Sequence, residues 1–159
     1  MDKMNRREQL FLVWAVSATG LVIALAAALF ILALPRSSTR FAIGRAEDFT
    51  PGSIRAVNLP DNFVDPLAIS ITAPKVWVVR DDAGAFTVLY ARSTFHGFAV
   101  NWVAEDNFFE DAALGSRWDR DGKYREGPDP RDLDRFPVSV ENGQAIIDLH
   151  LIRGVSHTQ

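Results

Sequence analysis

The residues of this chain that could do chemistry are few, and the type that most often holds redox clusters is missing. The chain contains no cysteine, so it can form no disulfide and offers no thiolate to a metal ion or an iron–sulfur cluster. Of its 3 histidines, His96 stands alone, and His150 and His157 have no partner at the spacing of a metal site. We therefore predict that no metal or cofactor is bound and that His96 is a surface or hydrogen-bonded histidine.

Carboxylates interleaved with basic side chains form a second candidate site. Their alternating signs are typical of a solvated loop face. A carboxylate pair for hydrolysis or a calcium site is the alternative, although the spacing of an EF-hand loop is not met. No nucleophile elbow, phosphate-binding loop or dinucleotide fingerprint accompanies them. The acidic members are Asp119, Asp121, Glu126, Asp129, Asp132 and Asp134, and the basic members are Arg117, Arg120, Lys123, Arg125, Arg131 and Arg135.

Residues 10–34 form an apolar segment without one Asp, Glu, Lys, Arg or His. About 20 apolar residues suffice to cross the hydrocarbon core of a bilayer. A cleaved secretory signal is the alternative, but its apolar region is about 7–15 residues long and ends in a small-residue cleavage site. Pro35 and Arg36 close the segment without such a site. We predict an uncleaved transmembrane helix over residues 10–34 and a single-pass membrane protein.

Basic residues flank both ends of this segment, so the positive-inside rule is nearly balanced. The Arg6–Arg7 pair just ahead of it reads like a twin-arginine export signal. We therefore predict a cytoplasmic segment over residues 1–9 and a domain on the extracytoplasmic side of the cell (inner) membrane. Small residues at four-residue spacing would allow a second helix to pack closely against the span. They are Gly20, Ala24 and Ala28.

The rest of the chain has the pattern of an all-β domain, expected over residues 41–159 after a short linker over residues 35–40. Short apolar and β-branched runs alternate with turn residues, and Asn142–Gly143 is the strongest hairpin signal. Residues 105–137 break the pattern, and we expect there a long ordered excursion from the sheet, of the kind that often carries function. The predicted strands are residues 53–57, 67–71, 76–80, 86–90, 98–103, 136–140 and 145–149.

Two segments and a loop carry a resemblance to a known family. Residues 93–102 read Ser-Thr-Phe-His-Gly-Phe-Ala-Val-Asn-Trp, residues 114–119 read Leu-Gly-Ser-Arg-Trp-Asp, and residues 127–130 read Gly-Pro-Asp-Pro. They resemble the two cluster-binding boxes and the proline loop of Rieske iron–sulfur subunits of quinol:cytochrome c oxidoreductases, the bc-type complexes. The resemblance implies an antiparallel β-sandwich with a cluster-binding subdomain, behind an N-terminal membrane helix.

The chain departs from that family wherever the family holds its cluster. The resemblance places the family's cysteine and histidine ligands at Ser93, Phe95, Asp111 and Leu114. It places the cysteines of the bracing disulfide at Phe98 and Ala113. A Rieske cluster needs two thiolates and two imidazoles, so these positions exclude its assembly. We expect the apolar side chains of Phe95, Phe98 and Leu114 to be buried together, either in the vacated site or against a partner.

These inferences together predict a degenerate Rieske-like subunit that is not an enzyme. We expect a cluster-free structural or accessory subunit of a respiratory or photosynthetic complex that contains a quinol-oxidising cytochrome b. Its partners would be cytochrome b-like and cytochrome c-like membrane subunits and the lipid bilayer. A net charge of -3 and a pI near 5.6 argue against nucleic acid. The alternatives are an electron carrier or oxidoreductase subunit with a different cofactor, and a free-standing membrane-anchored binding module.

Overall fold

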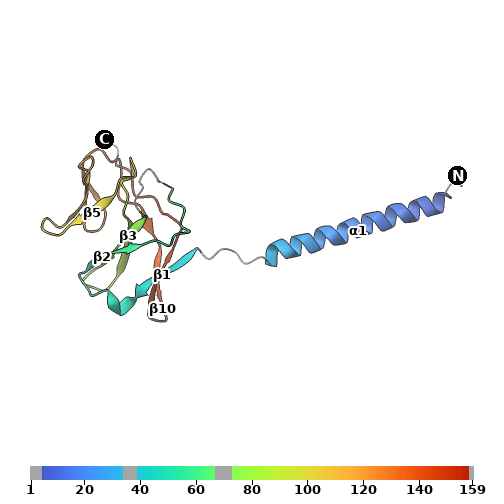
Figure 1. Cartoon of the computed structure of the whole chain (residues 1–159), viewed down its shortest axis with the longest axis horizontal. Coiled ribbons are helices and arrows are strands. Elements are labelled where there is room, and N and C mark those ends of the chain that lie inside the picture. Colours follow the sequence, from blue (N-terminus) through green and yellow to red (C-terminus); the bar gives the residue numbers. More distant parts are fainter. Residues whose placement is uncertain (1–4, 34–38, 67–72, 158–159) are drawn as a thin grey trace. The chain divides into compact units, whose positions relative to one another are not determined.

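The computed structural model describes residues 5–33, 39–66 and 73–157. By its internal contacts the chain divides into two compact units, residues 1–37 and residues 38–159. The described part of the first unit is one helix, and the described strands all belong to the second (Figure 1).

The helix α1 runs over Arg6–Ala33. Its sequence is rich in alanine and leucine, which are strong helix formers, and Pro35 follows its end. Gly20 and Ala24 are exposed on it, whereas the side chain of Ala28 lies outside the described residues. A search of the described residues finds no helix with the length and apolar character needed to cross a membrane. The transmembrane span over residues 10–34 and its helix interface are thus not confirmed and stay predictions.

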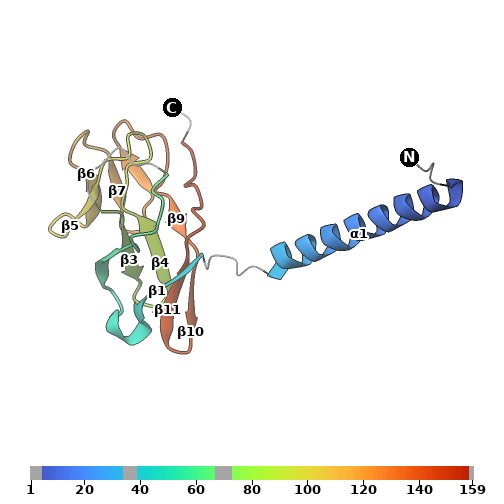
Figure 2. The ribbon, with the colours of Figure 1, turned by 45° about the vertical axis from the view of Figure 1, so that its right-hand side comes forward.

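The β domain consists of three antiparallel sheets (Figure 2). The first has the order β1-β11-β10, with β1 at Arg40–Arg45, β10 at Val138–Glu141 and β11 at Gln144–Asp148. The second has the order β2-β3-β4-β9, with β2 at Ile54–Asn58, β3 at Lys75–Arg80, β4 at Phe86–Tyr90 and β9 at Arg135–Phe136. The third has the order β5-β6-β7-β8, with β5 at Val100–Val103, β6 at Phe108–Asp111, β7 at Arg117–Asp119 and β8 at Tyr124–Glu126.

The second sheet is apolar on both faces, because side chains along a strand point alternately to either side. Val78 of β3 belongs to a core that also contains Ile147 of the first sheet. Its neighbour Val79 belongs to a different core, which contains Phe109 and Trp118 of the third sheet. The second sheet therefore lies between the other two and supplies side chains to both cores.

Most of the predicted strands are confirmed, and the hairpin at Asn142–Gly143 joins β10 to β11. Both of its turn residues have positive φ, at 49° and 76°, as the favoured two-residue hairpin turn requires. The predicted strand over residues 67–71 lies outside the described residues. Residues 105–137 are ordered, as predicted, but they contain three strands of the third sheet rather than a plain loop. These strands are only 3 or 4 residues long, too short to show a period in the sequence.

Candidate functional site

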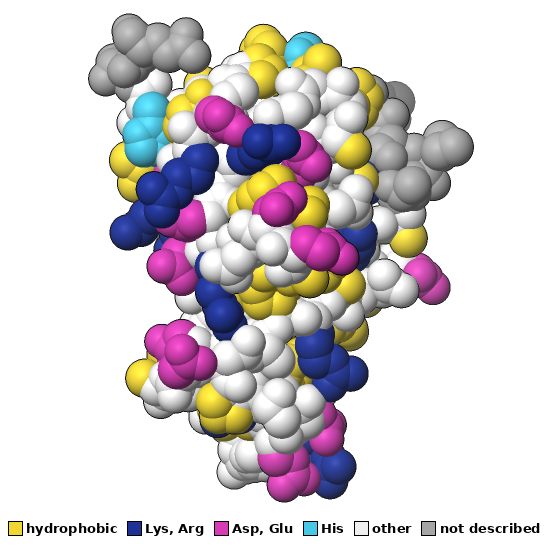
Figure 3. Space-filling model, turned by 90° about the vertical axis from the view of Figure 1, so that its left-hand side faces the viewer, with side chains coloured by type: hydrophobic (Ala, Val, Ile, Leu, Met, Phe, Trp, Pro, Cys, Tyr) yellow, Lys and Arg dark blue, Asp and Glu magenta, His cyan; other side chains and the backbone are white. Residues whose placement is uncertain are grey.

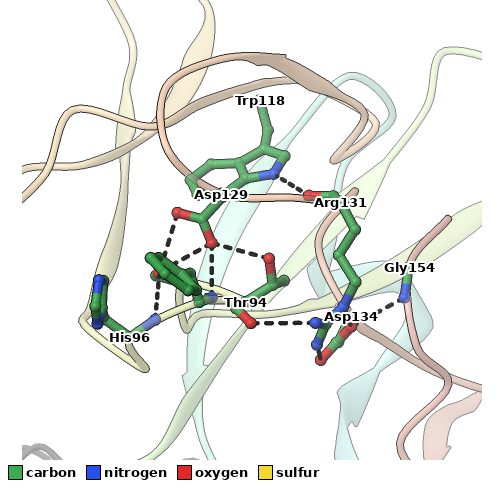
Figure 4. A network of polar contacts seen from close by, with 9 residues as sticks. Thr94, His96, Trp118, Asp129, Arg131, Asp134 and Gly154 are labelled. Carbon is green, nitrogen blue, oxygen red and sulfur yellow. Dashed lines mark hydrogen bonds and ion pairs between the residues drawn. The ribbon is translucent and has the colours of Figure 1, made fainter. Parts of the chain in front are cut away.

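The candidate site lies where three loops meet at the third sheet. One loop, residues 93–99, joins β4 to β5, and a second, residues 112–116, joins β6 to β7. We call these two loops the tip. A third loop, residues 127–134, joins β8 to β9, and we call it the plug loop. Figure 4 shows how side chains of the plug loop reach the backbone and hydroxyl groups of the tip.

Both tip loops are tight turns closed by backbone hydrogen bonds. In the first, the Gly97 N–H donates to the Ser93 carbonyl at 3.0 Å, and Gly97 has a φ of 69°. In the second, the Gly115 N–H donates to the Asp111 carbonyl at 2.7 Å, and Gly115 has a φ of 76°. Such left-handed conformations favour glycine, which explains why both turns carry it.

The plug loop places the carboxylate of Asp129 against the first tip loop. Asp129 is 0% exposed. Its Oδ1 accepts hydrogen bonds from the Thr94 hydroxyl at 2.8 Å, the Phe95 N–H at 2.8 Å and the Ser93 hydroxyl at 3.0 Å. The Asp129 N–H in turn donates to the hydroxyl oxygen of Ser116 in the second tip loop at 3.0 Å. One residue of the plug loop therefore joins both loops of the tip.

Asp111 is a second carboxyl that is wholly buried, but it accepts fewer hydrogen bonds than Asp129. Its Oδ1 accepts a hydrogen bond from the Ala113 N–H at 2.9 Å, while its Oδ2 has no hydrogen-bond partner among the described residues. Burial raises the pKa of Asp111 above its ordinary value, and the charge of Asp129 adds to this shift, although the bond from Ala113 opposes it. The site thus combines one buried carboxylate that accepts several hydrogen bonds with one buried carboxyl whose pKa is raised.

The carboxylates predicted to lie on a solvated loop face are in part buried, so that prediction is wrong for the plug loop. Asp129, Asp132 and Asp134 are at most 7% exposed. Asp134 pairs with the guanidinium of Arg131 at 2.9 Å, and Asp132 with the imidazole of His157 at 2.7 Å. The Arg131–Asp134 pair joins two members of the alternating set, whereas the partner of Asp132 is His157. Asp129 is compensated by uncharged donors, because a buried charge needs a partner or hydrogen bonds. Elsewhere, acidic and basic side chains are interspersed over the face of the domain in Figure 3.

The apolar side chains of the tip are exposed within this chain. Phe95 is 57% exposed, Leu114 is 42% exposed and Phe98 is 36% exposed. The prediction that they fill the vacated site is therefore wrong, because all three are exposed, while the Asp129 carboxylate lies against the first tip loop. Burial against a partner remains a prediction. The ring of half-buried His96 lies between the two phenylalanines, with ring centroids at 4.1 Å from Phe95 and 5.8 Å from Phe98.

The site does not fit the iron–sulfur cluster that the family resemblance implies. Phe95 and Leu114 have no lone pair to offer, and the Ser93 hydroxyl is already bonded to Asp129. Asp111 offers only oxygen, where the cluster needs sulfur or nitrogen. Across the described ranges, no group of three or more His, Asp or Glu side chains could hold a metal ion. The described histidines are half-buried or more exposed.

Sequence reasoning missed the role of Asp129, although a signal was present. Asp129 lies in the loop that resembles the family's proline loop, so it places an acidic side chain where that loop would cover a cluster. Its meaning depends on Ser93, Thr94 and Phe95, which precede it by more than thirty positions in the sequence, with separations of 36, 35 and 34. Only the fold brings these donors to the carboxylate.

Comparison of the sequence with known proteins finds two similar iron–sulfur subunits. No protein-family model matches it. It is 24% identical over 108 residues to the cytochrome b6-f complex iron-sulfur subunit of Chlorobaculum tepidum, covering 68% of this chain and 52% of that protein. It is 31% identical over 70 residues to the same subunit of Chlorobaculum thiosulfatiphilum, covering 44% of this chain and 39% of that protein. The chain thus spans about half of the length of the first relative and less than half of the length of the second.

The fold agrees with these matches. The plasma membrane Rieske protein PetC3 from Synechocystis PCC 6803 superposes with a TM-score of 0.51 at 21% identity, covering 67% of this chain and 97% of that chain. A likeness at this identity bears on the fold. The β domain therefore has a Rieske fold, and the chain is a cysteine-free, Rieske-like protein similar to the iron–sulfur subunits of cytochrome b6-f complexes.

Proposed function

We propose that this chain is a cluster-free, non-catalytic Rieske-like subunit with a structural role in a membrane electron-transfer complex. The observation that carries the proposal is the buried carboxylate of Asp129. It uses the hydroxyl and amide donors of the loop that would carry one thiolate and one imidazole in the family. Releasing those donors would leave buried polar groups unpaired, which costs about 1–3 kcal/mol for each group. The tip is therefore organised around a carboxylate and needs no cofactor to hold its shape.

The proposal includes membrane anchoring by residues 10–34, with the N-terminus cytoplasmic and the β domain extracytoplasmic. It is supported by the uncharged sequence of that segment and by the relatives, which are named as a cytochrome b6-f subunit and a plasma membrane protein. The partners would be cytochrome b-like and cytochrome c-like subunits. The exposed tip residues Phe95, Phe98 and Leu114 are the candidate contact surface, because clustered exposed apolar side chains commonly mark an interface.

Purification of the tagged full chain from its native membrane in mild detergent tests the proposal. We expect cytochrome-bearing subunits to co-purify, and we expect no Rieske-type electron paramagnetic resonance signal from the isolated chain. Stoichiometric iron with that signal would overturn the cluster-free assignment. A visible absorbance spectrum of the isolated chain would instead support the carrier with another cofactor. Recovery of the chain alone would favour the free-standing binding module.

A matched pair of variants tests the contact surface. Phe98→Asp should lower the yield of co-purified subunits by about tenfold, because an unpaired charge is costly in an apolar interface. Val64→Asp is the control, since Val64 is an apolar residue that is 85% exposed outside the tip. Equal yields for the two variants, with both folded, would show that the tip is not the contact surface.

A further inference from the structure

Residues 152–157, which we call the C-terminal strap, run along the plug loop. Arg135 and Ile152 exchange two backbone hydrogen bonds, each 2.8 Å long. The Asp132 N–H donates to the Val155 carbonyl at 2.9 Å, and the His157 N–H donates to the Pro130 carbonyl at 2.8 Å. Backbone hydrogen bonds thus hold the strap against the plug loop and against the first residue of β9.

The closest approach is at Gly154. A Cβ atom added there would lie 2.0 Å from the backbone oxygen of Asp132, so any side chain would push the strap off the loop. The Gly154 N–H also donates to Asp134 Oδ1 at 2.9 Å. This glycine is required for close approach rather than for a special φ, which is a position where substitution acts on packing directly.

From Asp134 the contacts continue into the tip (Figure 4). Asp134 holds the guanidinium of Arg131 by two hydrogen bonds, at 2.9 and 3.1 Å. Arg131 in turn donates to the backbone oxygen of Thr94 at 3.1 Å. Thr94 is also a donor to Asp129, so the same stretch of the tip is held twice by the plug loop.

The end of the strap is fastened by a side chain. His157 Nε2 lies 2.7 Å from Asp132 Oδ1, and its ring stacks on Tyr124 at a centroid distance of 5.4 Å. Burial opposes the charge of Asp132, but the hydrogen bonds from His157 and the Tyr124 N–H outweigh it and hold the pKa of Asp132 below its ordinary value. The Asp132 carboxylate is therefore stabilised when the strap is in place.

We propose that the C-terminal strap controls the order of the tip, because it holds the plug loop that supplies Asp129 and Arg131 to it. With the strap in place, the tip presents its apolar side chains on a fixed backbone. Displacement of the strap frees the plug loop, and the tip loop 93–99 then loses its carboxylate and its guanidinium together. This inference does not rest on the proposed function, since it concerns contacts within the β domain alone.

Native-state amide hydrogen exchange on the full chain in mild detergent tests this coupling. Gly154→Ala should speed exchange of the Phe95 and Gly97 amides by about tenfold or more, while the Val88 amide of β4 changes far less. Gly143→Ala is the matched control. Its φ of 76° strains an alanine, but its Cβ meets nothing within 4 Å, and it lies in the β10–β11 turn.

The two glycine variants separate coupling from general loss of stability. If Gly154→Ala speeds exchange at Phe95 no more than it does at Val88, and no more than Gly143→Ala does at Phe95, the strap does not control the tip. Should Gly154→Ala fail to fold, His157→Gln provides the same test, because His157 is half exposed and its loss unfastens only the end of the strap. We expect about threefold faster exchange at Phe95 for that variant, and no change there would overturn the proposal.

Discussion

At the scale of single residues, Asp129 and Asp111 are both wholly buried but differ in the donors that surround them. Asp129 receives three donors on one oxygen, whereas Asp111 has an oxygen without a partner among the described residues. A buried carboxylate is stable only where donors compensate for lost water. Removing the charge should therefore destabilise the folded protein at Asp129 but not at Asp111.

Truncation of Asp129 measures the importance of its donors. Asp129→Ala leaves the Ser93 and Thr94 hydroxyls and the Phe95 amide without an acceptor, so we expect a loss of about 3 kcal/mol in the free energy of unfolding. Asp129→Asn keeps one acceptor oxygen and should lose about 1 kcal/mol. Urea unfolding of the full chain gives both values. Asp121→Ala, at an exposed carboxylate, is the control and should stay within about 0.5 kcal/mol of the wild type. If Asp129→Ala lost no more stability than this control, the role assigned to Asp129 would be contradicted.

Asp111 should make stability fall as pH rises. Its pKa is raised on folding by burial, so the folded state binds the proton more tightly than the unfolded state. Stability is then lost between the unfolded pKa of about 3.9 and the raised folded pKa. Asp111→Asn cannot titrate, and its unfolding free energy should lack this decline above about pH 4. Urea unfolding at steps of pH decides the matter, and identical pH profiles for variant and wild type would count against a raised pKa.

At the scale of elements, short loops rather than strands build the site. The tip and the plug loop approach each other where Gly127 meets Ser116, and a Cβ atom on Gly127 would lie 2.4 Å from the Ser116 Cα. The strands on either side fix the ends of these loops, since β6 pairs with β7 and β7 with β8. Loop geometry at this contact should therefore limit the stability of the whole site.

A pair of glycine substitutions isolates that contact. Gly127→Ala meets backbone atoms and also has an unfavourable φ of 109°, so we expect it to cost about 3 kcal/mol or more. Gly115→Ala has an unfavourable φ of 76° but meets nothing within 4 Å, and should cost about 1 kcal/mol. The melting temperature followed by near-ultraviolet circular dichroism compares them. Equal shifts would mean that the close approach to Ser116 is unimportant.

At the scale of the whole molecule, the proposed role concerns docking rather than transport. In the Rieske family, a head that carries an electron on its cluster has reason to move between donor and acceptor. The head of this chain has no cysteine with which to hold such a cluster. A fixed position is therefore the simpler arrangement for a structural subunit.

We predict that the β domain is docked in one position in its complex. Residues 36–40 would then be an ordered connection, although residues 36–38 lie outside the described residues. Holding the head fixed costs conformational entropy, so the contact should bury about 1,200 Å² or more. A map of the intact complex, sorted by head position, checks this expectation. Several well-populated head positions would show that the domain moves.

The sequence by itself determined the β character of the domain, the β10–β11 hairpin and the absence of thiolates. These features follow from local patterns and composition: alternation over five or six residues, the Asn142–Gly143 pair and a residue type that is missing. The tertiary structure alone decided that Asp129 is buried, that Phe95 is exposed and that residues 108–126 supply three strands that form a sheet with β5. The reason is physical, because the burial of a charge depends on donors far away in the sequence, and strands of three residues are too short to leave a period.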